Sequence, residues 1–120
     1  MSLTIEEHEL LWLFEVEPKK AHEHEYWFLT TSVYRVEKGD LTLSFSIHPH
    51  YKDIGIVLLK DDQKILDISA TSVNAVTAKK VDKGETLTGE ILEIEVDDNQ
   101  KILLQVKPEI AIHQEICATS

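Results

Sequence analysis

Apolar and polar residues alternate along most of this chain, which is the period expected of half-buried β-strands. The clearest case is residues 41–48, where Leu41, Leu43, Phe45 and Ile47 alternate with serine, threonine and histidine. Similar segments recur towards the C-terminal end, separated by short polar stretches. The pattern predicts an all-β protein, an antiparallel meander of sequential hairpins with about nine strands.

Four short polar segments separate these strands, and each is predicted to be a three-residue hairpin loop. Two of them end in glycine and one in asparagine, residue types that accept the left-handed backbone conformation found in such loops. The four segments are residues 37–39, 61–63, 82–84 and 97–99. A meander of this kind closes into a small barrel or divides into a β-sandwich, since both arrangements remove or protect strand edges.

The loops also predict which residues pair across each hairpin, because apolar side chains should meet on the buried face. For the first hairpin the predicted pairs are Val36–Asp40, Val33–Leu43 and Leu29–Ile47. For the second hairpin they are Lys60–Lys64, Leu58–Leu66, Ile56–Ile68 and Ile54–Ala70, and for the last they are Ile94–Ile102 and Leu92–Leu104. Gly89 interrupts the apolar phase of its strand, which predicts a bulge or sharp bend there.

The N-terminal segment shows two different patterns. Residues 4–7 have the form of a helix capping box, so a short helix is expected at the start of the domain. Residues 11–17 then alternate, with Trp12, Phe14 and Val16 on one face, and this predicts the first strand.

Two predicted strands, residues 26–36 and 54–59, carry large apolar residues on both faces. Such strands need cover on their second face. The N-terminal segment, a second sheet or a second subunit would supply it, and the last of these would make the protein a homodimer.

Size and composition indicate a single globular domain spanning residues 1–120, with 42% hydrophobic residues. The longest apolar runs are far shorter than the roughly 20 residues that cross a bilayer, so no membrane segment is expected. The N-terminus lacks the basic and apolar regions of a signal peptide, and Cys117, the single cysteine, cannot form an intrachain disulfide. These features predict a soluble cytoplasmic protein.

The chain carries a net charge of -10 and a pI of about 4.9, and Arg35 is its single arginine. Direct nucleic-acid binding is disfavoured, because it requires clustered lysine and arginine. Residues 1–17 and 90–98 contain acidic residues and no lysine or arginine. Such a surface steers a basic protein partner, although acidity also serves solubility alone. The predicted acidic partner-binding surface comprises Glu15, Glu17, Glu90, Glu93, Glu95, Asp97 and Asp98.

Histidine is the most suggestive residue type for chemistry. His22 and His24 precede one predicted strand, and His48 and His50 end another. Residues two apart on a strand share a face, with Cα atoms roughly 6.6 Å apart, a spacing that lets two imidazoles converge on one metal.

In the predicted register His24 opposes Lys52 and His50 opposes Tyr26, so the two histidine pairs would be neighbours. With Glu23 or Glu25 they would suit zinc, copper, nickel or iron. Against this, both pairs sit at strand ends, where polar residues are expected in any case. No metal-binding motif is present, so no resident cofactor is expected beyond this candidate metal site.

Other catalytic features are weaker still. Cys117 has no sequence signature of a paired base, and no glycine-rich phosphate loop is present. The carboxylates of Asp53, Asp67, Glu90 and Glu93 have no distinctive spacing. The sequence therefore favours a protein that is not an enzyme.

Three functions remain open. The first is a small acidic binding protein without catalysis, such as an inhibitor, an immunity or anti-defence protein, or an assembly subunit. The second is a β-barrel carrier of a small ligand, its cavity lined in part by the small residues of segment 69–78. The third is a metal-dependent enzyme or metal sensor that uses the four histidines.

Overall fold

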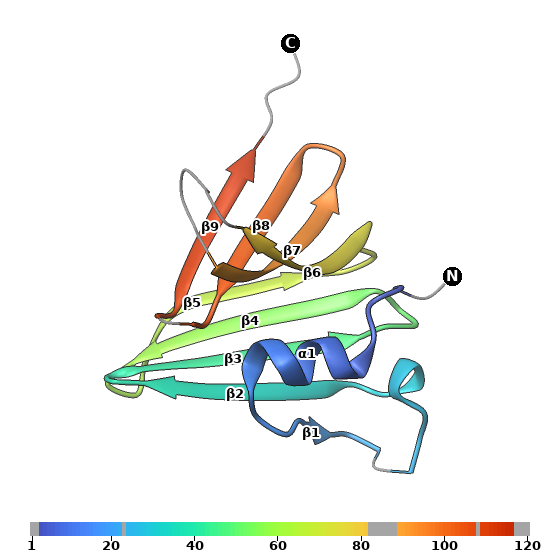
Figure 1. Cartoon of the computed structure of the whole chain (residues 1–120), viewed down its shortest axis with the longest axis horizontal. Coiled ribbons are helices and arrows are strands. Elements are labelled where there is room, and N and C mark those ends of the chain that lie inside the picture. Colours follow the sequence, from blue (N-terminus) through green and yellow to red (C-terminus); the bar gives the residue numbers. More distant parts are fainter. Residues whose placement is uncertain (1–2, 23, 82–88, 108, 117–120) are drawn as a thin grey trace.

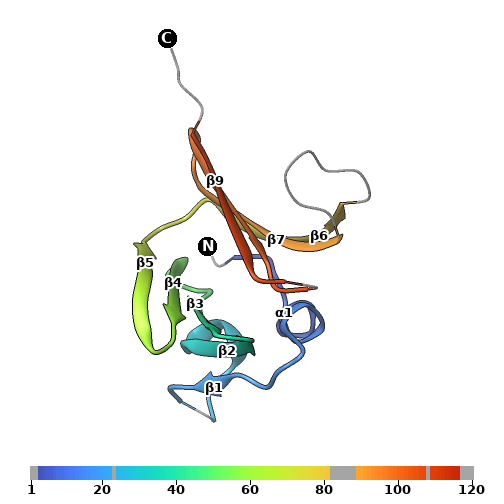
Figure 2. The same cartoon turned by 90° about the vertical axis from the view of Figure 1, so that its left-hand side faces the viewer.

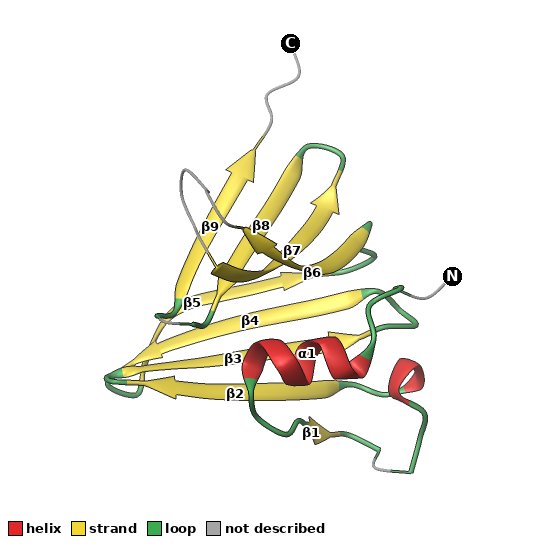
Figure 3. Cartoon of the chain, viewed as in Figure 1, coloured by secondary structure: helices red, strands yellow, loops and turns green. Residues whose placement is uncertain are grey.

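The computed structural model describes residues 3–22, 24–81, 89–107 and 109–116. Strands dominate this part of the chain (Figure 3). The two helical elements are α1 (Glu7–Phe14) and the 3-10 turn η1 (Trp27–Leu29). The strands are β1 (Lys19–Lys20), β2 (Ser32–Lys38), β3 (Leu41–His48), β4 (Asp53–Lys60), β5 (Gln63–Ala70), β6 (Ala75–Val81), β7 (Gly89–Asp97), β8 (Gln100–Gln105) and β9 (Ala111–Ile116). The predicted all-β class is confirmed.

The strands form two antiparallel sheets, ordered β1-β2-β3-β4-β5 and β6-β7-β8-β9 (Figure 1). Within each sheet, every strand pairs with the next one along the chain, so the meander is confirmed, and the chain passes from one sheet to the other between β5 and β6. Among the described residues the meander divides into two sheets and does not close into one barrel. Figure 2 shows α1 and the second sheet on one side of the first sheet, and no described strand of the second sheet on its other side. We call that uncovered side the outer face.

The hydrophobic core lies where α1 and the inner sides of both sheets meet. The Phe14 ring of α1 stacks on Tyr34 of β2 and on Phe45 of β3, with ring centroids 5.1 and 5.4 Å apart. The other buried side chains of the strands in this core are Val36, Leu43, Ile47, Ile54, Ile56, Val76, Leu92, Ile94, Ile102 and Leu104. Side chains from all three layers therefore share one core.

Residues 11–14 belong to a helix, so the predicted strand over residues 11–17 is wrong. Leu10, Leu13 and Phe14 are buried at the spacing of one helix face, whereas Trp12 points outward and is 47% exposed. The backbone N–H of Glu6 donates a hydrogen bond to the Glu9 carboxylate at 2.8 Å, which caps the first turn. The expected N-terminal helix is thus present, but it begins later and runs longer than the motif at residues 4–7 indicated.

The predicted strand over residues 26–36 is also wrong in its first half, which forms η1 before β2 begins at Ser32. The hairpin turns at Gly39 and Asp40, with Gly39 at φ 63°, so Val36 pairs with Leu43 and not with Asp40. This shift of three residues is odd and therefore exchanges the two faces of β2. Tyr34 enters the core in place of Val33.

The two later hairpins have the predicted apolar pairs. Ile54–Ala70, Ile56–Ile68, Leu58–Leu66, Ile94–Ile102 and Leu92–Leu104 are all observed. A register shift beyond Leu58 makes Lys60 pair with Gln63 and not with Lys64. The turn at Asp61 and Asp62 is a two-residue turn with positive φ at both positions. Gly89 has φ 94° and begins β7, and the bulge or bend predicted there stays a prediction. The predicted loop at residues 82–84 lies outside the described residues.

The segment rich in small residues, 69–78, is not a single strand. It comprises the end of β5, a link and the start of β6, and so it carries the chain from the first sheet to the second. Val73 in this link is fully buried, and its N–H donates a hydrogen bond to the Lys52 carbonyl at 2.9 Å. The link is therefore anchored to the first sheet and packed into the core.

Tyr34 provides a test of how much a buried hydroxyl group without a hydrogen bond costs in stability. Its hydroxyl is buried without a hydrogen-bond partner among the described residues. Burial raises the pKa of Tyr34 above its usual range, and the charges of Glu7 and Glu17 add to the effect. We expect Tyr34→Phe to leave the free energy of unfolding unchanged or to raise it by up to about 1 kcal/mol, because an unpaired buried hydroxyl is costly. Urea denaturation measures this, and a loss of stability would reveal a partner for the hydroxyl.

Candidate functional site

The outer face of the first sheet contains an open concavity of about 410 Å³, near the turn between β3 and β4. Its floor is formed by Ser46, Gly55 and Ser69, which are direct neighbours across three strands, and its rim includes His48, Tyr51 and Asp53. We call this concavity the outer groove. Its residues come from β3, β4, β5 and the turns that join them, so a rigid sheet sets their positions.

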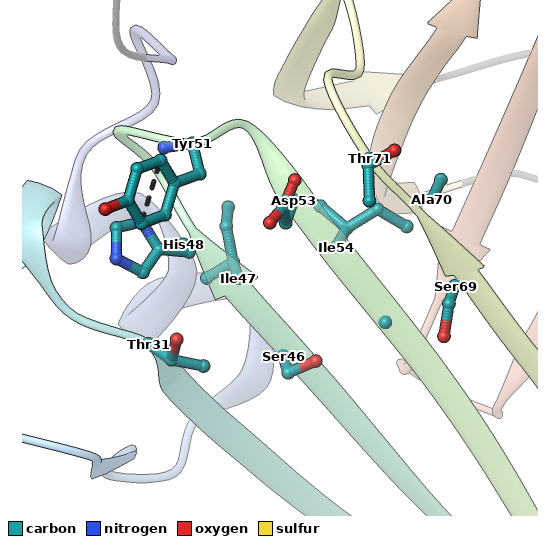
Figure 4. Close-up of a pocket in the computed structure, with 11 residues that line it drawn as sticks. Thr31, Ser46, Ile47, His48, Tyr51, Asp53, Ile54, Ser69, Ala70 and Thr71 are labelled. Atoms are coloured by element: carbon teal, nitrogen blue, oxygen red, sulfur yellow. Dashed lines mark hydrogen bonds between the residues drawn. The ribbon is translucent and has the colours of Figure 1, made fainter.

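The floor of the outer groove is shaped by a glycine. A Cβ atom at Gly55 would lie 2.6 Å from the Ser46 hydroxyl oxygen, closer than real contacts allow. Glycine therefore lets Ser46 lie over the middle of β4. Figure 4 shows Ser46 and Ser69 on either side of this strand. Hydroxyl groups thus line a floor that has no bulky side chain at its centre.

The rim of the groove is held in place by its own contacts. The rings of His48 and Tyr51 stack with centroids 4.3 Å apart, and the Tyr51 N–H donates a hydrogen bond to His48 Nδ1 at 3.3 Å (Figure 4). Tyr51 is nevertheless 63% exposed. One ring face is therefore fixed by packing while much of the residue remains open to a ligand.

Exposed aromatic residues continue beyond the groove. Tyr26 and Phe28 stack with ring centroids 5.8 Å apart, and both are exposed, Tyr26 to 72%. The His50 N–H donates a hydrogen bond to the Phe28 carbonyl at 2.9 Å, which ties η1 to the β3–β4 turn. The His50 ring lies 5.4 Å from that of Tyr51. We call Tyr26, Phe28, His50 and Tyr51 together the aromatic rim.

Asp53 is the acidic residue of the outer groove. Its carboxylate accepts a long contact of 3.4 Å from the Ser72 N–H and has no basic partner among the described residues. Two other pairs of charged side chains lie on the outer face. Arg35 lies 3.5 Å from Glu37, and Lys64 lies 3.0 Å from Asp67.

The structure does not pair the four histidines as the predicted register required. His24 does not oppose Lys52, and His50 does not oppose Tyr26, because residues 26–31 are not part of a strand. The His22 N–H instead donates a hydrogen bond to Thr30 Oγ1 at 3.0 Å. Within the described ranges no group of three or more histidine, cysteine or acidic side chains is placed to hold a metal. A metal bound by His22, His24, His48 and His50 stays a prediction.

The predicted acidic surface is divided among separate places. Glu15 and Glu90 both pair with Lys107, and Glu93 on the outside of the second sheet pairs with Lys79. At the β7–β8 turn Asp97 accepts a hydrogen bond from the Asn99 N–H, and Asp98 accepts one from the Asn74 side chain. Glu17 is exposed next to β1, and Glu95 lies within β7. Partner binding by these seven residues stays a prediction.

Lys107 joins the end of α1 to the second sheet. Its ammonium contacts Glu15 at 2.9 Å, the Trp12 carbonyl at 3.2 Å and the Glu90 carboxylate. Partial burial disfavours its charge, but the hydrogen bonds and charges of Glu15 and Glu90 outweigh this and raise the pKa of Lys107. The hydrogen bond from Lys107 and its charge lower the pKa of Glu15.

We expect Lys107→Met to lower the free energy of unfolding by about 1 kcal/mol at neutral pH, because the helix end loses a cation. The lowered pKa of Glu15 means that its contribution is present above its usual pKa and is lost as the pH falls through the folded value. The raised pKa of Lys107 means that its own contribution disappears only in strong alkali. Urea denaturation of both proteins should show a difference that shrinks as the pH falls below the usual pKa of a glutamate. A difference independent of pH would contradict the ion-pair assignment.

Sequence reasoning did not assemble the outer groove. Asp53 stood out only as one of several carboxylates, and Tyr51 carried no motif. The available signal was Gly55, a glycine inside an apolar strand, which indicates close approach of a neighbouring group. Another concavity of the described residues lies near Gly39 and Ile110 and is also open at the surface.

No helix of the described part of the chain has the length and apolarity to cross a membrane. No family model matches the chain, and no curated protein matches it either. Among solved structures, the fold is similar to that of a chain from a contact-dependent growth inhibition toxin–immunity protein complex of Klebsiella pneumoniae 342. The TM-score is 0.78 at 21% sequence identity, and the match covers 96% of this chain and 98% of that chain. The two chains thus share a fold over nearly their whole lengths.

Proposed function

We propose that this protein is an immunity protein, which protects its cell by binding a toxin and which has no catalytic activity of its own. The observation that carries the proposal is the shared fold, since the matched chain comes from a toxin–immunity complex and the match spans both chains almost end to end.

Features of this chain favour the antidote over the toxin. It is strongly acidic, with a net charge of -10, as suits a protein that binds a basic partner. Inhibition by binding requires only a complementary surface, and a rigid sheet with exposed aromatic residues supplies one. A basic toxin would be drawn to it by charge.

Binding and protection can be tested together. A cell that makes a toxin needs the antidote at the same time, so the natural probe is the protein encoded beside the gene for this chain. We expect the two purified proteins to form a stable complex with a Kd of about 1 nM or lower. Expression of this chain should also restore growth to cells that make the toxin. Absence of a complex, or a complex without protection, would contradict the proposal.

The rate of complex formation provides a separate prediction. If the charge of this protein steers its partner, the association rate constant should fall by about tenfold or more between low salt and about 0.5 M salt. The dissociation rate constant should change much less. Stopped-flow fluorescence measures both. An association rate that is independent of salt would remove charge from the recognition mechanism.

A further inference from the structure

We propose that the outer groove and the aromatic rim form the toxin-docking surface, and that the groove receives a lysine or arginine side chain from a loop of the toxin. This inference rests on the proposed immunity function and adds the place and the chemistry of recognition. Its occupant is thus a basic protein loop.

Charge is the first argument for a basic occupant. Asp53 lies on the groove rim without a basic partner among the described residues, whereas Arg35 and Lys64 on the same face pair with Glu37 and Asp67. A lysine or arginine that reaches the groove would therefore gain a carboxylate without displacing an existing ion pair. A charged hydrogen bond of this kind is stronger than a neutral one.

Shape and hydrogen bonding are the second argument. The groove is an open concavity of about 410 Å³ with room for a side chain, and the Ser46 hydroxyl lies over Gly55 on its floor. The hydroxyl groups of Ser46 and Ser69 flank this opening and can accept hydrogen bonds from an ammonium or guanidinium group. Tyr51 at the rim presents an aromatic face on which a cation can rest.

The aromatic rim is the third argument. Its residues are exposed yet already stacked or hydrogen-bonded to one another, so little side-chain freedom remains to be lost on binding. Tyrosine is also enriched among the residues that dominate interface energies. Tyr51 belongs to both the rim and the groove, so the two features form one continuous surface.

The predicted acidic surface is the rival location. Three of its members, Glu15, Glu90 and Glu93, already pair with lysines of this chain. A toxin that bound them would have to compete with those pairs. Glu95 is the rival residue best suited to a matched test, since Glu95→Gln and Asp53→Asn each remove one negative charge.

The test measures toxin binding by surface plasmon resonance, with the purified toxin encoded beside this gene as the probe. We expect Tyr51→Ala to weaken binding by about thirtyfold or more, mainly through faster dissociation. Tyr51→Phe keeps the ring and should stay within about threefold of the native protein. Asp53→Asn should raise the dissociation rate by about tenfold, as expected for a charge that is buried in the complex.

Two control variants separate the groove from the rest of the surface. Glu95→Gln should lower only the association rate, and only slightly, because it changes the overall charge without touching the partner. Trp12→Ala removes an exposed aromatic residue of α1, far along the chain from the groove turn, and should bind like the native protein. Thermal unfolding of each variant confirms that the fold is retained.

The outcomes distinguish the two proposals. If the native protein binds the toxin and the Tyr51 and Asp53 variants bind equally well, the docking surface is wrong while the immunity function stands. If the toxin dissociates faster from Glu95→Gln and from no other variant, the toxin-docking surface lies on the second sheet and the groove proposal is wrong. If the native protein is a dimer that Tyr51→Ala converts into a monomer, the rim is a homodimer interface and the docking proposal is wrong. If the native protein binds no toxin, both proposals fall.

Discussion

Phe14→Ala will lower the free energy of unfolding by about 3–5 kcal/mol, the range for truncating a buried aromatic residue. The Phe14 ring contacts Tyr34 and Phe45 at once, so its loss leaves a cavity between α1 and the first sheet. Neither neighbour can easily fill it, because both are fully buried in a shared core. Urea denaturation, monitored by intrinsic fluorescence, gives the difference in unfolding free energy directly.

Trp12→Ala is the matched control, because Trp12 lies on the same helix but faces outward. We expect it to cost about 1 kcal/mol or less, since an exposed side chain contributes little to the core. In a strand the two residues would share a face, and both changes would be costly. Similar losses for the two variants would therefore contradict the helix.

Leu104→Ala will lower the free energy of unfolding by about 2–5 kcal/mol. Leu104 is fully buried in the second sheet, where it pairs with Leu92 and Ile112. Truncating it removes apolar contacts and leaves a cavity facing α1 and the first sheet.

Leu103→Ala provides a control of the same residue type, one position away and on the opposite face of the sheet. Leu103 is only partly buried, so its loss should cost about 1 kcal/mol or less. Guanidinium or thermal denaturation measures the loss of stability of each variant relative to the native protein. An equal cost at the two positions would show that the register of the second sheet is shifted.

The N-terminal helix shows where sequence patterns lose information. Residues 10–14 are all apolar, and a short apolar run is compatible with either a strand or a buried helix segment. The capping contact between Glu6 and Glu9 favours the helix, but glutamates alone do not reveal which of several is the cap. Packing of Leu10, Leu13 and Phe14 against two sheets makes the choice, and that packing depends on the rest of the chain.

The first hairpin shows a second limit. Its apolar residues occur on both faces of the predicted strand, so the pattern allowed two registers. The turn at Gly39 and Asp40 determines which one forms. In the second and third hairpins the register inferred from the loops placed apolar residues opposite one another, and the pairs Ile56–Ile68 and Ile94–Ile102 followed from the sequence.

The candidate site was the least predictable part. The groove depends on a cross-strand row of Ser46, Gly55 and Ser69, whose neighbours follow only from correct strand registers. The spacing of the histidines predicted a metal site, whereas the turn between β3 and β4 places the His48 ring against Tyr51. Chemistry that arises from turns and from neighbouring strands leaves little trace in linear spacing.

The position of α1 has a consequence for how the protein acquires its fold. The helix precedes both sheets in the chain, but it packs against β6 and β7, which follow the first sheet. Hairpins of a meander can form one after another as the chain leaves the ribosome, whereas these helix contacts must wait until both sheets exist. The apolar side of α1 therefore stays uncovered by the second sheet until β6 and β7 have been synthesised.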